Sequence, residues 1–188
     1  MIKIFGGVAK GFTLKAPSNQ NTRPTSILLR RKFFDSVQDL TGYTFIDLCS
    51  GTGSVGLEAL SRGAEKVHFV ENSKQAYKVL KQNVDDMGKK FSKSEISHVV
   101  MMDFSKWLFL KFTEINSEKT FLFFDPPYDK IELYEALFSF LEHNQFLGRV
   151  IIEACQQKTL KIDEFEKKFG PSIKQYKKGT SYFLIYEF

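Results

Sequence analysis

The stretch Thr44-Phe45-Ile46-Asp47-Leu48-Cys49-Ser50-Gly51-Thr52-Gly53-Ser54-Val55-Gly56 decides the expected fold. Residues 44–49 are nearly all apolar, which is typical of a strand buried on both faces of a parallel sheet. The glycines that follow have the spacing of a nucleotide-binding loop, and a helix is expected over 55–60. A second apolar run at 66–70 completes a strand–loop–helix–strand unit.

The same alternation continues through the chain. We expect helices at 73–87, 104–112 and 131–141, strands at 98–102, 121–124 and 150–154, and a closing antiparallel hairpin at 173–177 and 182–187. This order predicts an α/β fold with a mostly parallel sheet between two layers of helices. Ahead of it, residues 2–14 predict a β-hairpin that turns at Gly6-Gly7. A helix capped by Thr25 or Ser26 follows, with Leu29, Phe33, Val37 and Leu40 on one face.

Length and composition indicate one well-packed domain. The 188 residues are 43% hydrophobic, and no apolar run approaches the roughly 18 residues of a membrane span. Cys49 and Cys155 end apolar runs, which predicts buried, reduced thiols in a cytoplasmic protein. The three histidines have no metal-type spacing with them, so no metal site is expected.

The positive charge is concentrated near the N-terminus. Residues 1–34 hold seven of the 27 basic residues and no acid, which leaves 20 basic against 22 acidic residues elsewhere. A basic arm on a slightly acidic body is typical of a contact with a phosphate backbone, although a solvated basic surface is the alternative. The candidate nucleic-acid-binding residues are Lys3, Lys10, Lys15, Arg23, Arg30 and Arg31.

The strand at 121–124 ends abruptly in Asp125-Pro126-Pro127-Tyr128. Two prolines can neither continue a helix nor donate to a sheet ladder, so a rigid rim remains. A carboxylate and carbonyl oxygens could hold an exocyclic amino group while the aromatic ring stacks on a flat base. These four residues are therefore the candidate catalytic residues.

Acidic residues follow the ends of the expected strands. Asp47, Glu71, Asp103, Asp125 and Glu153 all lie at or just beyond a carboxyl end. Ligands of open parallel sheets bind at that edge, near the point where the strand order reverses. A site lined by carboxylates is expected there.

The glycine loop by itself fits either a nicotinamide or an adenosyl cofactor, with Glu71 placed to accept hydrogen bonds from ribose hydroxyls. Asp47 suits a cationic aminoacyl group better than a pyrophosphate. The rim at 125–128 has no evident use in hydride transfer. Both features favour S-adenosyl-L-methionine. The candidate cofactor-binding residues are Asp47, Ser50, Gly51, Gly53, Glu71, Asn72, Asp103 and Phe104.

Several motifs occur together in this order: Gly6-Gly7, Thr22-Arg23-Pro24-Thr25, residues 47–64, Phe69-Val70-Glu71 and Asp125-Pro126-Pro127-Tyr128. In these motifs the chain resembles the RsmD family, bacterial methyltransferases that modify N2 of a guanine in 16S ribosomal RNA. It departs from the family pattern at Ile27, Leu28, Arg31 and Ser73.

The resemblance implies a class I S-adenosylmethionine-dependent methyltransferase: a Rossmann-like, mostly parallel seven-stranded sheet with an antiparallel last strand. It implies an RNA-contacting extension at 1–40, a methyltransferase domain at 41–188, and a monomer acting on 16S rRNA or a 30S assembly intermediate. An adenine-N6 DNA methyltransferase, a non-catalytic RNA-binding assembly factor and a nicotinamide-dependent oxidoreductase stay open as alternatives.

Overall fold

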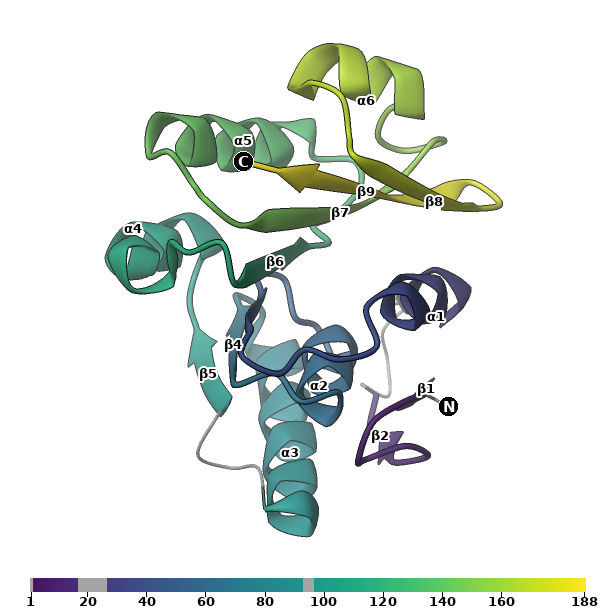
Figure 1. Ribbon diagram of the computed structural model, residues 1–188, viewed down its shortest axis with the longest axis vertical. Coiled ribbons are helices and arrows are strands. Elements are labelled where there is room, and N and C mark those ends of the chain that lie inside the picture. Colours follow the sequence, from purple (N-terminus) through teal and green to yellow (C-terminus); the bar gives the residue numbers. More distant parts are fainter. Residues whose placement is uncertain (1, 17–26, 93–96) are drawn as a thin grey trace.

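The computed structural model describes residues 2–16, 27–92 and 97–188 (Figure 1). The Thr22–Thr25 motif, Arg23 and the two candidate caps of the first helix lie outside the described residues. The strands are β1 (Ile2–Lys3), β2 (Thr13–Leu14), β3 (Thr44–Asp47), β4 (Lys66–Glu71), β5 (Ser97–Met101), β6 (Thr120–Phe124), β7 (Arg149–Cys155), β8 (Lys174–Lys178) and β9 (Ser181–Glu187). The helices are α1 (Ile27–Ser36), α2 (Ser54–Ser61), α3 (Lys74–Phe91), α4 (Phe104–Ile115), α5 (Ile131–His143) and α6 (Ile162–Phe169).

Seven strands form the main sheet in the order β5-β4-β3-β6-β7-β9-β8. The first five strands in this order, β5, β4, β3, β6 and β7, pair in parallel with their neighbours among these five. Strand β9 runs antiparallel to both of its neighbours, β7 and β8. The prediction of a mostly parallel sheet with an antiparallel last strand is confirmed. Because β3 lies between β4 and β6, the strand order reverses there, which is where such sheets bind their ligands.

The sheet separates two hydrophobic cores. One core joins the inner faces of α1, α2 and α3 to the sheet, and it also contains Ile2, Ile4 and Leu14 of the N-terminal hairpin. The other lies under α4, α5 and α6. All five residues of β6 are buried, as expected for a strand covered on both faces.

The N-terminal strands form their own two-stranded sheet, beside α1 and α2 in Figure 1. The hairpin is confirmed, but the predicted tight turn at Gly6-Gly7 is wrong, because residues 4–12 form a longer loop between β1 and β2. Gly7 has φ of 69°, and a Cβ there would lie 1.8 Å from the Ser61 carbonyl oxygen. Close contact with the end of α2, rather than a hairpin turn, requires glycine at this position.

Other differences are small. Leu40 is buried, but it lies beyond the end of α1, where its N–H donates to the Arg62 carbonyl. Helix α6 was not expected from the sequence. The boundary at residue 40, between an RNA-contacting extension and a methyltransferase domain, stays a prediction. Within the described ranges, no helix has both the length and the apolar character needed to cross a bilayer.

Candidate active site

A cavity of about 890 Å³ opens at the carboxyl ends of β3, β4, β5 and β6. It brings together six of the eight candidate cofactor residues and all four residues of the candidate catalytic rim. The residues from these two sets are Ser50, Gly51, Glu71, Asn72, Asp103, Phe104, Asp125, Pro126, Pro127 and Tyr128. Asp47 and Gly53 do not line it.

The glycine loop forms one wall of the cavity. Gly53 caps α2 with φ of 79°, a left-handed conformation that favours glycine. The Ser50 hydroxyl donates to the carbonyls of Asp47 (2.7 Å) and Val70 (3.2 Å), which ties the loop to β3 and β4. A Cβ on Gly51 would meet nothing within 4 Å, so the backbone on this wall is open to a ligand.

Glu71 is held in a fixed orientation at the end of β4. Its Oε2 accepts from the Gly51 N–H at 2.8 Å, and its Oε1 accepts from the Ser73 N–H at 2.7 Å. The Ser73 side chain then accepts from the Ala76 N–H and caps α3. Ser73, a departure from the family pattern, therefore has a structural role while the Glu71 carboxylate stays on the cavity wall.

The structure corrects the role expected of Asp47. The side chain is 1% exposed, and its Oδ2 accepts from the Gly56 N–H at 3.0 Å, inside the first turn of α2. Burial raises the pKa of Asp47 to about 7, with Glu71 and Glu153 adding to the rise and the Gly56 hydrogen bond opposing it. Asp47 therefore stabilises the start of α2 from beneath the cavity.

Asp103 both lines the cavity and caps α4. Its Oδ1 accepts from the backbone N–H groups of Ser105 (3.0 Å) and Lys106 (3.4 Å) and from the Ser105 hydroxyl. The Ser105 hydroxyl is the main cause of a lowered pKa of Asp103. Asp103 thus serves as the N-cap of α4 and also lies on the cavity wall. Phe104, 7% exposed, lies next to it.

The candidate catalytic rim is fixed by hydrogen bonds at both ends of Tyr128. The Tyr128 hydroxyl donates to Glu153 Oε1 at 2.9 Å, and the Thr159 hydroxyl donates to the Tyr128 carbonyl at 2.7 Å. Burial raises the pKa of Tyr128, and Asp125 and Glu153 raise it further, so the phenol stays protonated. Glu153 is 1% exposed and supports the rim from below.

The cavity also contains residues that the sequence did not indicate. Lys130 and Leu133, which follow the rim in the sequence, line the cavity, and so do Cys49 and Met102. Ile2, Leu14 and Ala16 show that the N-terminal hairpin forms part of the wall. Lys15, between Leu14 and Ala16, hydrogen-bonds through its backbone to Asn83 of α3, which lies far away in the sequence.

The candidate nucleic-acid-binding residues differ in their positions. Lys3, Lys10, Lys15 and Arg31 are exposed; Lys15 pairs with Asp86 at 2.8 Å and Arg31 with Asp35 at 3.7 Å. Arg30 is 1% exposed, and its guanidinium donates to two backbone carbonyls, so the expectation that it contacts RNA is corrected. Burial lowers the pKa of Arg30. Arg23 lies outside the described residues.

No group of three or more His, Cys, Asp or Glu residues in the described part of the chain could hold a metal ion. The seven-stranded sheet with one reversed strand, and the cavity at its switch point, define a class I methyltransferase fold.

The comparisons give the family. The family model described as "Conserved hypothetical protein 95" matches residues 2–187, and the chain belongs to this family, the RsmD family. It is 30% identical over 149 residues to YlbH of Bacillus subtilis, covering 78% of this chain and 77% of that protein. It is 29% identical over 147 residues to "Ribosomal RNA small subunit methyltransferase D" of Haemophilus influenzae, covering 78% and 73%.

Solved structures agree with the fold. A hypothetical protein of Thermus thermophilus superposes with a TM-score of 0.75 at 26% identity, covering all of both chains. The yhhF protein of Escherichia coli also gives a TM-score of 0.75, at 22% identity, covering 99% of this chain and 97% of that one.

Proposed function

We propose that this protein transfers a methyl group from S-adenosyl-L-methionine to the exocyclic N2 of a guanine in small-subunit (16S) ribosomal RNA. One observation carries the proposal: a single cavity joins the Gly51–Glu71 wall to the Asp125–Tyr128 rim. The names of the curated relatives support ribosomal RNA as the substrate class.

The cavity wall suits an adenosyl cofactor. The Glu71 carboxylate is already oriented by two backbone N–H groups, and each of its oxygens keeps acceptor capacity for a ribose hydroxyl. Gly51 leaves the loop open, and Phe104 and Met102 offer apolar surface to a flat ring. Asn72 and Asp103 add polar atoms at the same end. We propose Ser50, Gly51, Glu71, Asn72, Asp103 and Phe104 as the residues that hold the cofactor.

When bound, the cofactor supplies a methyl group already activated by its sulfonium. The protein must therefore align a weak nucleophile and exclude water. The Asp125 carboxylate and the Pro126 carbonyl would accept the two N–H groups of the guanine amine. The Tyr128 ring would stack on the extruded base, an interaction of about 1–3 kcal/mol. No strong general base is needed, because the amine releases its proton readily once methylated.

The exposed lysines of the hairpin would contact RNA phosphates. Lys3 and Lys10 can be changed to alanine together while the backbone of the hairpin stays bound to α1 and α2. The slope of log affinity against log salt concentration is negative, and each lost phosphate contact should make it shallower by about 0.7–0.9. RNA titrations at several salt concentrations measure this, and an unchanged slope would exclude both lysines from the interface. A monomer acting in the cytoplasm on 16S rRNA or a 30S intermediate is part of the same proposal.

The deciding experiment uses ribosomal RNA and 30S particles from cells that lack this gene. The purified protein is incubated with either substrate and labelled S-adenosylmethionine, and the RNA is digested to nucleosides. We expect the label in N2-methylguanosine with the wild-type protein and almost none with Asp125→Ala. Label in N6-methyladenosine, or none in any nucleoside, would refute the proposed reaction.

A further inference from the structure

Two buried side chains connect the glycine loop to the N-terminal hairpin. Asn83 of α3, 1% exposed, donates through Nδ2 to the carbonyls of Thr52 (2.9 Å) and Lys15 (3.0 Å), and its Oδ1 accepts from the Lys15 N–H at 2.8 Å. Arg30 of α1 donates through Nη1 to the Ser54 carbonyl (3.0 Å) and through Nη2 to the Lys3 carbonyl (2.6 Å). Each side chain thus binds one carbonyl of the loop region and one of the hairpin.

The two bridges reach both strands of the hairpin. Lys3 belongs to β1, whereas Lys15 directly follows β2. On the loop side, Thr52 lies between the two positive-φ glycines, and Ser54 is the first residue of α2. The hairpin cannot leave its position without breaking hydrogen bonds that also hold the loop.

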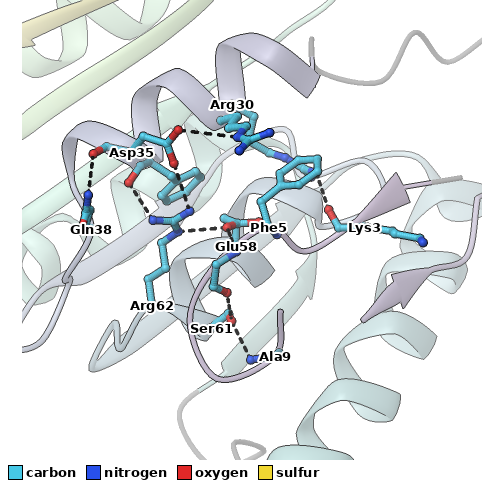
Figure 2. A network of polar contacts seen from close by, with 12 residues as sticks. Lys3, Phe5, Ala9, Arg30, Asp35, Gln38, Glu58, Ser61 and Arg62 are labelled. Atoms are coloured by element: carbon cyan, nitrogen blue, oxygen red, sulfur yellow. Dashed lines mark hydrogen bonds and ion pairs between the residues drawn. The ribbon is translucent and has the colours of Figure 1, made fainter. Parts of the chain in front are cut away.

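A second set of contacts binds residues 5–9 to α2 (Figure 2). The Glu58 carboxylate accepts from the N–H groups of Phe5 and Gly6, both at 2.8 Å. The Ser61 hydroxyl accepts from the Ala9 N–H at 2.9 Å and donates to the Gly6 carbonyl. Phe5, Gly6 and Ala9 do not line the cavity, so a ligand in the cavity would not touch their amides.

We propose that the hairpin is part of the cofactor site, and that Asn83 is a positioning residue that couples docking of residues 2–16 to occupancy of the cavity. The proposal rests on the proposed use of an adenosyl cofactor. Ile2, Leu14 and Ala16 line the cavity, and Asn83 also holds Thr52, which lines the same cavity. A ligand that needs both the hairpin and the glycine loop in place stabilises the docked hairpin, and by linkage the docked hairpin raises affinity for the ligand.

Hydrogen exchange with S-adenosylhomocysteine as the probe tests the coupling in the whole protein. The measured groups are the amides of Phe5, Gly6 and Ala9, and the amides of α6 serve as the internal control. If the undocked state does not bind the ligand, exchange of the three hairpin amides slows by up to about a hundredfold at a concentration of 100 times Kd. Hydrogen exchange of α6 amides that occurs through local opening of that helix should keep the same rate when the ligand is added.

Calorimetry on three variants separates positioning from general loss of stability. Asn83→Ala should weaken S-adenosylhomocysteine binding at least about fivefold and remove most of the ligand-dependent protection of the hairpin. Asp86→Ala, which removes only the exposed ion pair with Lys15, should behave as wild type. Phe165→Leu destabilises the core under α6 and should lower the melting temperature without changing affinity.

The outcomes are distinguishable. If wild-type protein binds no S-adenosylhomocysteine, the proposed function fails and this inference fails with it. If it binds the ligand, but hydrogen exchange of the hairpin amides slows less than twofold or no more than exchange of the α6 amides, the coupling alone is overturned. Wild-type affinity in Asn83→Ala would also overturn it. Should that variant not fold, the exchange experiment on wild-type protein decides.

Discussion

Replacing Glu58 should destabilise the protein more than any surface charge change. Glu58 is fully buried and accepts hydrogen bonds from Phe5 N–H (2.8 Å), Gly6 N–H (2.8 Å) and Arg62 Nε (2.9 Å). Glu58→Ala leaves two backbone donors and a guanidinium that is 7% exposed without this acceptor. Breaking a buried pair from one side costs about 3–5 kcal/mol. For a chain of this size the melting temperature would fall by about 6–20 °C.

Urea unfolding followed by circular dichroism measures the loss as a shift of the midpoint at constant slope. Glu58→Gln keeps one oxygen acceptor and should lose less, about 1.5–3 kcal/mol. Glu187→Ala is the matched control, because it breaks the half-exposed pair with Arg149 and should change stability by less than about 1 kcal/mol. A loss below about 1 kcal/mol for Glu58→Ala would refute the view that this carboxylate holds the hairpin.

Three further predictions concern the site. Asp125→Ala should cut turnover at least about a hundredfold while S-adenosylhomocysteine affinity stays within a few-fold, because alignment of the amine acts mainly in the transition state; a comparable loss of affinity by calorimetry would reassign it to the cofactor. Glu71→Ala should weaken cofactor binding by about 1.5–3 kcal/mol through loss of charged hydrogen bonds, and unchanged affinity would remove Glu71 from the site. Because the pKa of Asp47 is about 7 in the folded protein against an ordinary value of 3.8, the folded state binds more protons between these pH values. Stability should therefore fall as pH rises from about 4 to about 7, and Asp47→Asn should flatten that fall in urea titrations; an equal fall in the variant would exclude Asp47 as the source.

The alternation of strands and helices could be predicted because it depends on local hydrophobic periodicity. Strand ends could be predicted for the same reason, so Glu71, Asp103 and Asp125 were expected at one edge, and they do meet there. How deeply each carboxylate is buried could not be predicted from the sequence. Asp47 follows the same pattern, yet the first turn of α2 folds over it and places its carboxylate below the cavity.

The roles of adjacent basic residues could not be separated by sequence either. Arg30 and Arg31 are neighbours on α1, about 100° apart around the helix axis. One therefore faces the hairpin and becomes buried, while the other stays exposed. The partners of Glu58 and Asn83 in the hairpin lie 52 to 68 residues away from them along the chain, and no local pattern indicates such contacts.

The contact between Lys15 and Asn83 spans 68 positions of the chain. At a synthesis rate of about 5–20 residues per second, roughly 3–14 s pass between the emergence of these two residues from the ribosome. The hairpin is therefore made well before α3, one of the elements that it packs against, and Ile2, Ile4 and Leu14 lack that cover until α3 emerges. During this interval these three apolar side chains of the nascent chain are accessible to chaperones and to neighbouring chains.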